Sequence, residues 1–340
     1  MKKSWRLALG LVVAALLVVG VAGYVAWRDM EQSLNRPVPI SSAVLFELRP
    51  GMSVNGVGQA FVARGWLRHA LYLRLEAARL ELSARIQAGY YDVRPGDTPR
   101  ALLRKFAAGD VKTYTVTFVE GSTFAEIRRQ TANLPGIVHE LRNATPEAVM
   151  AALGAPGQPS EGWLFPSTYH YHHNSTDRVL LSRAYRKMHE VLARHWERRA
   201  PNLPYASPYE ALVMASIVEK ETGKPEERSA VAGVFVRRLQ KKMRLQTDPT
   251  VIYGLGTAFD GNLRRADLKR DTPYNTYTRA GLPPTPICSP GEDAIAASLA
   301  PAAGDALYFV ARGDGSHVFS NTLEAHNAAV REYQLRGEGQ

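Results

Sequence analysis

The sequence predicts an α+β fold with a single N-terminal transmembrane helix. Three observations predict this class. Residues 7–27 are apolar and carry no charge. The first half of the chain then holds short alternating runs, each followed by a glycine-containing turn and an amphipathic pattern. The second half holds long runs with helical periodicity, so we expect a small α+β module followed by a mainly helical domain with a β-hairpin.

Residues 7–27 predict a membrane anchor. At about 1.5 Å per residue, a helix of this length crosses a hydrocarbon core of about 30 Å. A cleaved signal peptide would have a shorter apolar region and a small-residue cleavage site, which GVAG at residues 20–23 matches only loosely. Lys2, Lys3 and Arg6 precede the segment, and such charges stay in the cytoplasm. We therefore expect a single-span protein whose bulk faces outward.

Charge and cysteine usage narrow the function classes only a little. The chain has 42 Lys plus Arg against 32 Asp plus Glu, a net charge of +10 that suits a membrane surface, an acidic polymer or a nucleic acid. Because no nucleic-acid motif accompanies the charge, we do not expect nucleic-acid binding. The single cysteine, Cys288, excludes an internal disulfide. His170, His172 and His173 lack an HExxH pattern or a cysteine pair, so no metal or other cofactor is expected.

The chain is expected to divide into five segments. They are a cytoplasmic tail and anchor (1–29), a tether (30–44), an α+β module (45–153), a catalytic domain (154–335) and a C-terminal tail (336–340). The border at 153/154 rests on a shift to glycine and proline in GAPGQPSEG.

A recurring phrase marks the α+β module. It occurs as FELRPGMS (46–53), YDVRPGDT (91–98) and VTFVEGST (116–123). Each copy predicts a strand, a turn and a Ser or Thr that caps a helix. The helices predicted after them cover residues 54–64, 99–108 and 124–131. Units of this kind resemble LysM-like carbohydrate-binding modules, and the alternative is a generic α+β spacer domain.

A longer helix is predicted between the first two units, over residues 67–86. Apolar residues recur on one face of this pattern, and arginines occupy the other positions. The face expected to point into the core consists of Leu71, Leu75, Ala78 and Leu82.

The catalytic domain is predicted from long helical patterns. They cover residues 178–198, 208–222 and 226 to about 240. SPYE at 207–210 predicts a capping box with proline at the first helical position, and SPGE at 289–292 repeats that device before an Ala-rich helix. Residues 306–320 predict a β-hairpin that turns at 313–315.

Two glutamates end the apolar run 211–218, and they cannot share a helix face. Glu219 and Glu221 are about 200° apart around the axis. Glu221 lies over residues 217–218, which are Ile and Val, whereas Glu219 lies over a smaller and partly polar strip. Desolvation raises the pKa of a carboxyl group, as a proton donor near neutral pH requires. Glu221 is thus the better candidate acid, and the alternative is that both are surface charges.

Two polar, aromatic loops follow, at residues 243–256 and 272–291. Sugar sites need side chains that hydrogen-bond hydroxyl groups and rings that cover the apolar faces of pyranoses. The candidates in these loops are Gln246, Thr247, Asp248, Tyr253, Tyr274, Asn275, Tyr277 and Thr278. The alternative is a proline-stiffened structural loop. EGWLFPSTYHYHH at 161–173 adds Trp163, Phe165, Tyr169 and Tyr171.

From about residue 45 to 335 the sequence resembles the endolytic murein transglycosylases of the MltG (YceG-like) family. Five motifs carry the resemblance in order: EGWLFPSTY, ASIVEKET, RLQTDPTVIYG, YNTYTRAGLPPTPICSPG and YFVARGDGSHVFSNTLEAHN. It implies an inner-membrane protein that faces the periplasm, with a LysM-like subdomain and a lysozyme-related catalytic domain. It also implies nascent peptidoglycan as substrate and peptidoglycan synthases as partners. HYHHNST departs from the family pattern.

The resemblance also implies roles for single residues. Lysozyme-like lytic enzymes typically show Glu followed by a small hydroxyl residue, a form that Glu221-Thr222 fits and Glu219-Lys220 does not. Glu221 would protonate the bond between N-acetylmuramic acid and N-acetylglucosamine, then deprotonate the C6 hydroxyl to leave a 1,6-anhydro end. Cleavage inside nascent strands would terminate glycan elongation. Substrate-binding residues expected outside the two loops are Glu161, Phe165, Tyr169 and Glu219.

Two other functions stay open at this point. One is a hydrolytic glycosidase in which Asp248 is the partner carboxylate of Glu221, and its product would carry an ordinary reducing end. The other is a non-catalytic cell-wall scaffold. A scaffold has no need for an acid on an apolar helical stripe beside loops suited to sugars.

Overall fold

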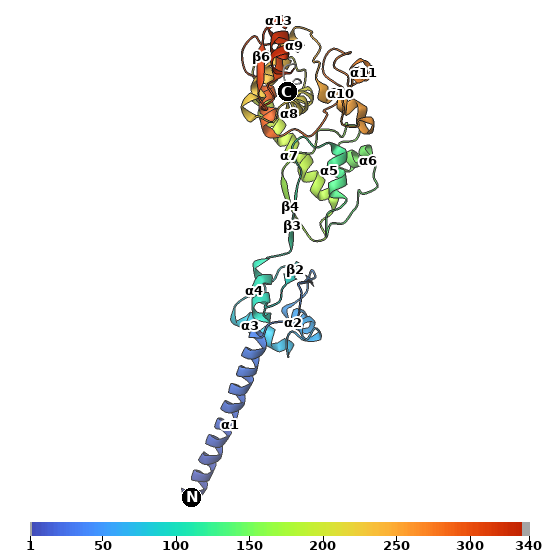
Figure 1. Cartoon of the computed structure of the whole chain (residues 1–340). Helices are drawn as coiled ribbons and strands as arrows, with labels where there is room; N and C mark the ends of the chain where they lie inside the picture. Colours follow the sequence, from blue (N-terminus) through green and yellow to red (C-terminus); the bar gives the residue numbers. More distant parts are fainter. Residues whose placement is uncertain (1, 335–340) are drawn as a thin grey trace. The chain divides into compact units, whose positions relative to one another are not determined.

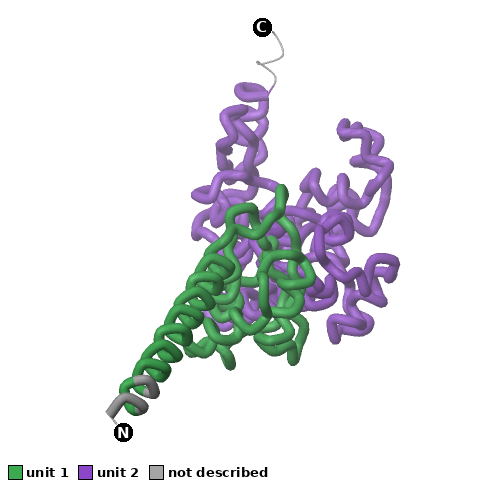
Figure 2. The backbone as a smooth tube through the Cα atoms, turned by 90° about the horizontal axis from the view of Figure 1, so that it is seen from below, with its two compact units in different colours: residues 1–114 green, residues 115–340 purple. Residues whose placement is uncertain are grey.

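The computed structural model describes residues 2–334, so the predicted tail at 336–340 lies outside the described residues. The chain divides into two compact units, residues 1–114 and 115–340 (Figures 1 and 2). Helices and small two-stranded sheets make up both units, which confirms the α+β class.

Unit 1 begins with the long helix α1 (Lys2–Asn35). Its stretch from Leu9 onward is the one helix among residues 2–334 that is long and apolar enough to cross a membrane. Large apolar side chains between Leu9 and Trp27 are exposed around the helix. A helix that is apolar on all sides needs apolar surroundings, which fits the predicted anchor.

The segment predicted as a tether, residues 30–44, is not a free linker. Its first residues continue α1, and Leu34 and Val38 are buried in the core of unit 1. The Arg100 guanidinium lies 2.7 Å from the Glu31 carboxylate and so ties the end of α1 to the helix at residues 99–108. Met30 and Leu34 on the last turns of the helix and Val38 just beyond its end contact this core, so the helix passes directly into the module.

The rest of unit 1 is a two-stranded sheet covered by short helices. The elements are β1 (Val44–Leu48), α2 (Val54–Ala63), α3 (Ala70–Arg79), β2 (Gly89–Val93) and α4 (Pro99–Ala108). β1 and β2 pair antiparallel. As predicted, Ser53 and Thr98 cap α2 and α4 by accepting backbone N–H groups. Phe46 stands at the centre of the core, with ring centroids of Phe61 and Phe106 both 5.4 Å away.

Helix α3 differs from the prediction in length and in its buried face. It covers ten residues, and it exposes Leu71 by 45% and Leu75 by 47%. Ala78 is exposed too, and Leu82 is half-buried beyond the helix end. The buried positions are Leu73, Glu76 and Ala77. Glu76 turns inward because two guanidinium groups, at 2.7 and 2.6 Å, compensate its charge, which apolar periodicity alone does not reveal.

Unit 2 is mainly helical and carries two small sheets. Its strands are β3 (Thr113–Thr117), β4 (Thr168–His172), β5 (Tyr308–Ala311) and β6 (His317–Ser320). Its longer helices are α5 (Phe124–Thr131), α7 (Asp177–Glu197), α8 (Pro208–Glu221), α9 (Arg228–Gln240), α10 (Asp248–Leu255), α12 (Glu292–Leu299) and α13 (Leu323–Tyr333). The shorter ones are α6 (Pro146–Ala152), η1 (Pro225–Glu227), η2 (Gly256–Ala258) and α11 (Arg265–Lys269). β3 pairs with β4, and β5 with β6.

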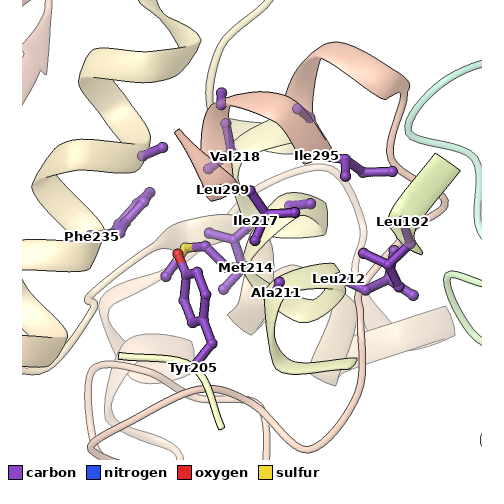
Figure 3. Packing of buried hydrophobic residues seen from close by; sticks show 14 of the residues in the cluster. Leu192, Tyr205, Ala211, Leu212, Met214, Ile217, Val218, Phe235, Ile295 and Leu299 are labelled. Atoms are coloured by element: carbon purple, nitrogen blue, oxygen red, sulfur yellow. The ribbon is translucent and has the colours of Figure 1, made fainter. Parts of the chain in front are cut away.

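Helix α8 forms the centre of unit 2. Every residue from 211 to 218 is buried, and α7, α9 and α12 pack around the helix. Figure 3 shows side chains of Met214, Ile217 and Val218 beside those of Phe235 and Leu299. This core fixes the last turn of α8, where both candidate glutamates lie.

The compact units divide at residue 114 and not at 153. The third copy of the recurring phrase therefore belongs to unit 2, although the sequence placed it in the α+β module. The backbone N–H of Phe118 donates to Ser167 (3.0 Å), and that of Phe124 donates to the Glu161 carboxylate (2.8 Å). These partners lie far along the chain, so the repeat pattern could not reveal them.

Helix starts in unit 2 agree with the sequence at most positions. The SPYE segment does not close a full capping box, because the Glu210 carboxylate accepts the N–H of Ala206 (2.7 Å). The capping box predicted at SPGE is wrong, because Gly291 and not Ser289 is the N-cap of α12. The predicted hairpin is present as β5 and β6, joined through the 312–316 turn.

Candidate active site

The end of α8 opens into a cavity of about 670 Å³ within unit 2. One wall comes from the loop that enters α10 and from Tyr277. The other comes from the β5–β6 hairpin and α13. Of the predicted site residues, Glu221, Gln246, Thr247, Asp248 and Tyr277 line it. The cavity therefore gathers the candidate acid with residues of both predicted sugar-binding loops.

Glu221 is a poised proton donor. Desolvation by the surrounding protein raises the pKa of its carboxyl group to about 7, against the opposing hydrogen bond from Thr247 and with added repulsion from Asp248. The Thr247 hydroxyl donates to the carboxyl oxygen Oε1. A carboxylic acid that is half protonated near neutral pH can both give and take a proton there.

Glu219 points away from this cavity and is partnered inside the fold. Its side chain is 7% exposed and accepts the backbone N–H of Gly291 at 3.0 Å. The Arg228 guanidinium lies 3.7 Å away. Burial raises the pKa of Glu219 too, but the residue joins α8 to the start of α12 and does not line the cavity. The two glutamates thus occupy opposite faces, as the helical angle predicts.

The two loops are joined at Thr276. Its hydroxyl accepts the N–H of Thr247 at 3.0 Å, and its carbonyl accepts the N–H of Gln246 at 3.2 Å. The Tyr277 hydroxyl donates to the Asp248 carboxylate at 2.6 Å. The first two bonds hold Thr247 beside Glu221, and the third holds Asp248 at the cavity edge. Polar side chains in the loops therefore position the groups that surround Glu221.

Sequence reasoning missed Arg238, a buried arginine of α9 that braces the cavity. Its guanidinium donates to the carbonyl of Leu245 (2.9 Å) and to that of Leu307 (2.6 Å). It also lies 5.1 Å from the ring centroid of Tyr308. One side chain thereby connects the loop before α10 to the hairpin. The only sequence signal was an arginine after the apolar run AVAGVFV, which equally fits a solvated helix end.

Glu161 and Tyr253 lie together, away from the cavity lining. The buried Glu161 carboxylate accepts the N–H of Phe124 and the hydroxyl of Tyr253 (3.0 Å). Burial raises the pKa of Glu161 against these hydrogen bonds. The Tyr253 ring lies edge-on to Tyr274 at 4.9 Å. The arrangement joins α5 to α10, and the predicted contact of both residues with substrate stays a prediction.

Four further predicted residues also serve the scaffold. Phe165 and Tyr169 are core residues, and the Tyr169 hydroxyl donates to the Phe165 carbonyl at 2.8 Å. The fully buried Asn275 amide donates to the Arg270 carbonyl at 2.7 Å, and Thr278 donates to Asp271 at 2.8 Å. None of the four lines the cavity. Their polar atoms are used to hold the loops that carry Thr247 and Tyr277.

Cys288 is buried beside α8, where its thiol lies 3.4 Å from the carbonyl of Ser216. Burial raises its pKa well above the ordinary value, so the thiolate is disfavoured. A packing role fits this position. The hairpin and α13 contribute further cavity residues that the sequence reasoning did not single out, among them Tyr308, His317 and His326.

Comparison with known proteins identifies the family. The sequence model of the YceG-like family matches residues 46–332. An endolytic murein transglycosylase of Bacillus subtilis is 33% identical over 264 residues, 73% of each chain. One of Streptococcus pneumoniae serotype 2 is 30% identical, and the match covers 95% of this chain and 64% of the relative.

A solved structure agrees. The crystal structure of a putative yceG-like protein from Listeria monocytogenes superposes with a TM-score of 0.52 at 28% identity, covering 85% of this chain and 99% of that one. The matched range includes all five motifs on which the resemblance rests. The chain therefore belongs to the YceG-like family.

Proposed function

We propose that this protein is an endolytic lytic transglycosylase of peptidoglycan. It cleaves the bond between N-acetylmuramic acid and N-acetylglucosamine within nascent strands and leaves 1,6-anhydro ends. The observation that carries the proposal is Glu221, whose pKa is raised to about 7 in a cavity walled by polar and aromatic side chains. The relatives named endolytic murein transglycosylases support the reaction class.

Glu221 performs two proton transfers in this reaction. As an acid it gives its proton to the glycosidic oxygen, so the N-acetylglucosamine departs with a new hydroxyl group. As a carboxylate it takes the proton of the C6 hydroxyl, while that oxygen bonds to C1 of the muramic acid. Glu221 gives one proton and takes one proton back, so it ends the reaction in its starting state, and no water is consumed.

Thr247 and Asp248 tune this acid. The Thr247 hydroxyl fixes the carboxyl orientation through its hydrogen bond. Asp248, held by Tyr277 at 2.6 Å, adds a negative charge that disfavours ionised Glu221. The same charge stabilises positive charge that develops on the sugar ring in the transition state.

A hydrolytic glycosidase is the second candidate. The observation that favours it is Asp248, a carboxylate in the same cavity as the acid. In that reaction Asp248 would serve as the partner carboxylate, and water would end the reaction. The product would carry a reducing end in place of an anhydro end.

The remaining organisation is proposed from the family and the anchor. Helix α1 spans the inner membrane once, and unit 2 faces the periplasm, where glycan strands are made. Unit 1 contains a LysM-like module, and the catalytic domain is related to lysozyme. Cleavage close to peptidoglycan synthases terminates glycan elongation. The continuous helix from the anchor into unit 1 supports a fixed position near the membrane.

The test is the chemistry of the new ends. The full-length protein in detergent would be incubated with unlinked glycan strands, and mass spectrometry would identify the fragments. We expect cuts inside the strands that leave fragments with 1,6-anhydro-muramic ends, and we expect none with Glu221→Gln. Reducing ends would favour the hydrolase. If folded protein cleaves nothing, the non-catalytic scaffold is favoured.

A further inference from the structure

His317 begins β6 on the hairpin side of the cavity, and both its main chain and its side chain are bound by one carboxylate. The Glu227 oxygen Oε1 accepts the His317 backbone N–H at 3.0 Å. The other oxygen, Oε2, lies 2.7 Å from the ring nitrogen Nδ1. Glu227 belongs to η1, just after the catalytic helix. The pair thus ties the hairpin to the segment that follows Glu221.

The pairing fixes which ring nitrogen carries hydrogen. Burial acts to raise the pKa of Glu227, but the hydrogen bonds from His317 outweigh it and hold that pKa below its usual value. Glu227 is therefore ionised at neutral pH, and an ionised carboxylate only accepts hydrogen bonds. Nδ1 must then carry the hydrogen, which leaves Nε2 as the ring nitrogen available for a further hydrogen bond.

We infer that the Nε2 edge of the ring faces the cavity. His317 lines the cavity, whereas Glu227, the partner of Nδ1, does not. Phe309 stands perpendicular to the imidazole with centroids 5.4 Å apart and limits its rotation. Among residues 2–334, no group hydrogen-bonds Nε2, although the side chain is only 10% exposed. An oriented ring nitrogen in the same cavity as the acid is therefore free for a ligand.

We propose that His317 is a substrate-binding residue whose Nε2 forms a hydrogen bond with a hydroxyl or acetamido group of the glycan, with Glu227 as the residue that positions it. The inference rests on the proposed function, because it takes the glycan cleaved by Glu221 as the ligand. It adds a contact on the hairpin side of the cavity, opposite the loops that hold Thr247.

Two isosteric substitutions separate this role from a structural one. In His317→Asn the amide replaces Nδ1 and keeps a donor to Glu227, but nothing reaches the position of Nε2. In His317→Gln the amide reaches the position of Nε2, and the side-chain bond to Glu227 is lost while the backbone bond is kept. A binding role therefore predicts that Asn impairs activity and Gln preserves much of it. A purely structural role predicts the opposite order.

The measurement is steady-state cleavage of unlinked glycan strands by the full-length protein in detergent. For His317→Asn we expect KM to rise about tenfold with little change in kcat, the effect of one lost hydrogen bond made equally in ground and transition states. For His317→Gln we expect KM within about threefold of wild type. Glu227→Gln leaves the ring in place but removes its fixed tautomer, so KM should rise as well. This variant repeats the test if His317→Asn does not fold.

A matched control exists in α7. His195 lies 2.9 Å from the Glu292 carboxylate, which makes it a second His–Glu pair that does not line the cavity. His195→Asn should leave KM unchanged. Binding of glycan strands to the inactive Glu221→Gln protein, with and without His317→Asn, provides a readout without turnover, and the double variant should bind about tenfold more weakly.

The outcomes distinguish the two proposals. If wild type makes anhydro ends and His317→Asn has the KM and glycan affinity of wild type, the role of His317 is refuted while the proposed function stands. If wild type makes no anhydro ends, the proposed function itself fails. A rise in KM for Asn that exceeds the rise for Gln supports the inference.

Discussion

Two glutamates whose surroundings act to raise the carboxyl pKa, the buried Glu76 in unit 1 and the half-buried Glu221 in unit 2, differ in their partners. The Glu76 side chain is 0% exposed, and two arginines lie within 2.7 Å of it. Burial acts to raise its pKa, but the hydrogen bonds from the guanidinium groups hold that pKa below its usual value. Among the described residues Glu221 forms no ion pair and is hydrogen-bonded by the Thr247 hydroxyl. The charges of His317 and Arg238 act to lower its pKa, but burial outweighs them and raises the pKa to about 7.

The difference shows that burial alone does not decide what a carboxyl group does. Paired with arginines, a buried carboxylate stays charged and contributes to folding. Without a paired cation, a carboxyl group whose burial outweighs the attraction of nearby charges retains its proton and can act as a catalytic acid. The pH dependence of the two groups should therefore have opposite signs, and the following predictions test this contrast in order of decreasing effect.

The largest expected effect is on cleavage. Glu221→Gln removes the only titrating proton of the proposed reaction, so activity should fall by about a thousandfold or more. The measurement is the rate of anhydro-end formation from unlinked strands. Glu219→Gln is the matched control, because it changes a neighbouring buried glutamate outside the cavity. Equal losses in both variants would refute the distinction between the two helix faces.

Removing the paired carboxylate should destabilise unit 1. Glu76→Gln removes the buried charge that Arg79 and Arg100 share, while Arg100 keeps its pair with Glu31, and should lower the free energy of unfolding by about 2 kcal/mol at pH 7. The stabilisation by Glu76 exists above the unfolded pKa of about 4.5 and is lost as the pH falls through the lower folded value. Denaturant unfolding at pH 7 and pH 4 measures both effects. Glu81→Gln, an exposed change nearby, should have little effect at either pH.

The catalytic acid should show the reverse stability effect. Because the folded pKa of Glu221 is raised to about 7, its stabilisation is present below about 4.5 and is lost as the pH rises to 7. Glu221→Gln should therefore be more stable than wild type by about 2 kcal/mol at pH 8 and nearly equal to it at pH 4. Denaturant unfolding at the two pH values tests this. A variant that is less stable at pH 8 would contradict the account.

The smallest expected effect concerns the hydroxyl beside the acid. Thr247→Val removes the hydrogen bond that lowers the pKa of Glu221, so the alkaline limb of activity should move upward by less than about one pH unit. Thr247→Ser keeps the hydroxyl and should leave the limb in place. A downward movement in the valine variant would mean that Thr247 does not act on Glu221.

Local signals in the sequence predicted much of this structure. The helices 99–108 and 124–131 have the predicted bounds, because capping residues and proline mark their starts. The faces of Glu219 and Glu221 followed from helical geometry within one element. The loops around Thr247 and Tyr277 were recognised by composition and do meet at the cavity.

Features that depend on distant partners were not predictable from local patterns. The inward face of α3 depends on Arg100, and the pairing of β3 depends on β4 far along the chain. Arg238 and His317 acquire their roles from carbonyls and a carboxylate supplied by other elements. Composition identified polar loop residues, but only the fold separates Thr247 in the cavity from Asn275 in the scaffold.

The most direct test of the central claim is the pH dependence of cleavage by wild type, Glu219→Gln and Glu221→Gln on the same glycan strands. The account predicts that wild type and Glu219→Gln share an alkaline limb with an apparent pKa near 7, and that Glu221→Gln is inactive at every pH. Loss of activity in Glu219→Gln alone, or an unchanged alkaline limb in Glu221→Gln, would contradict it.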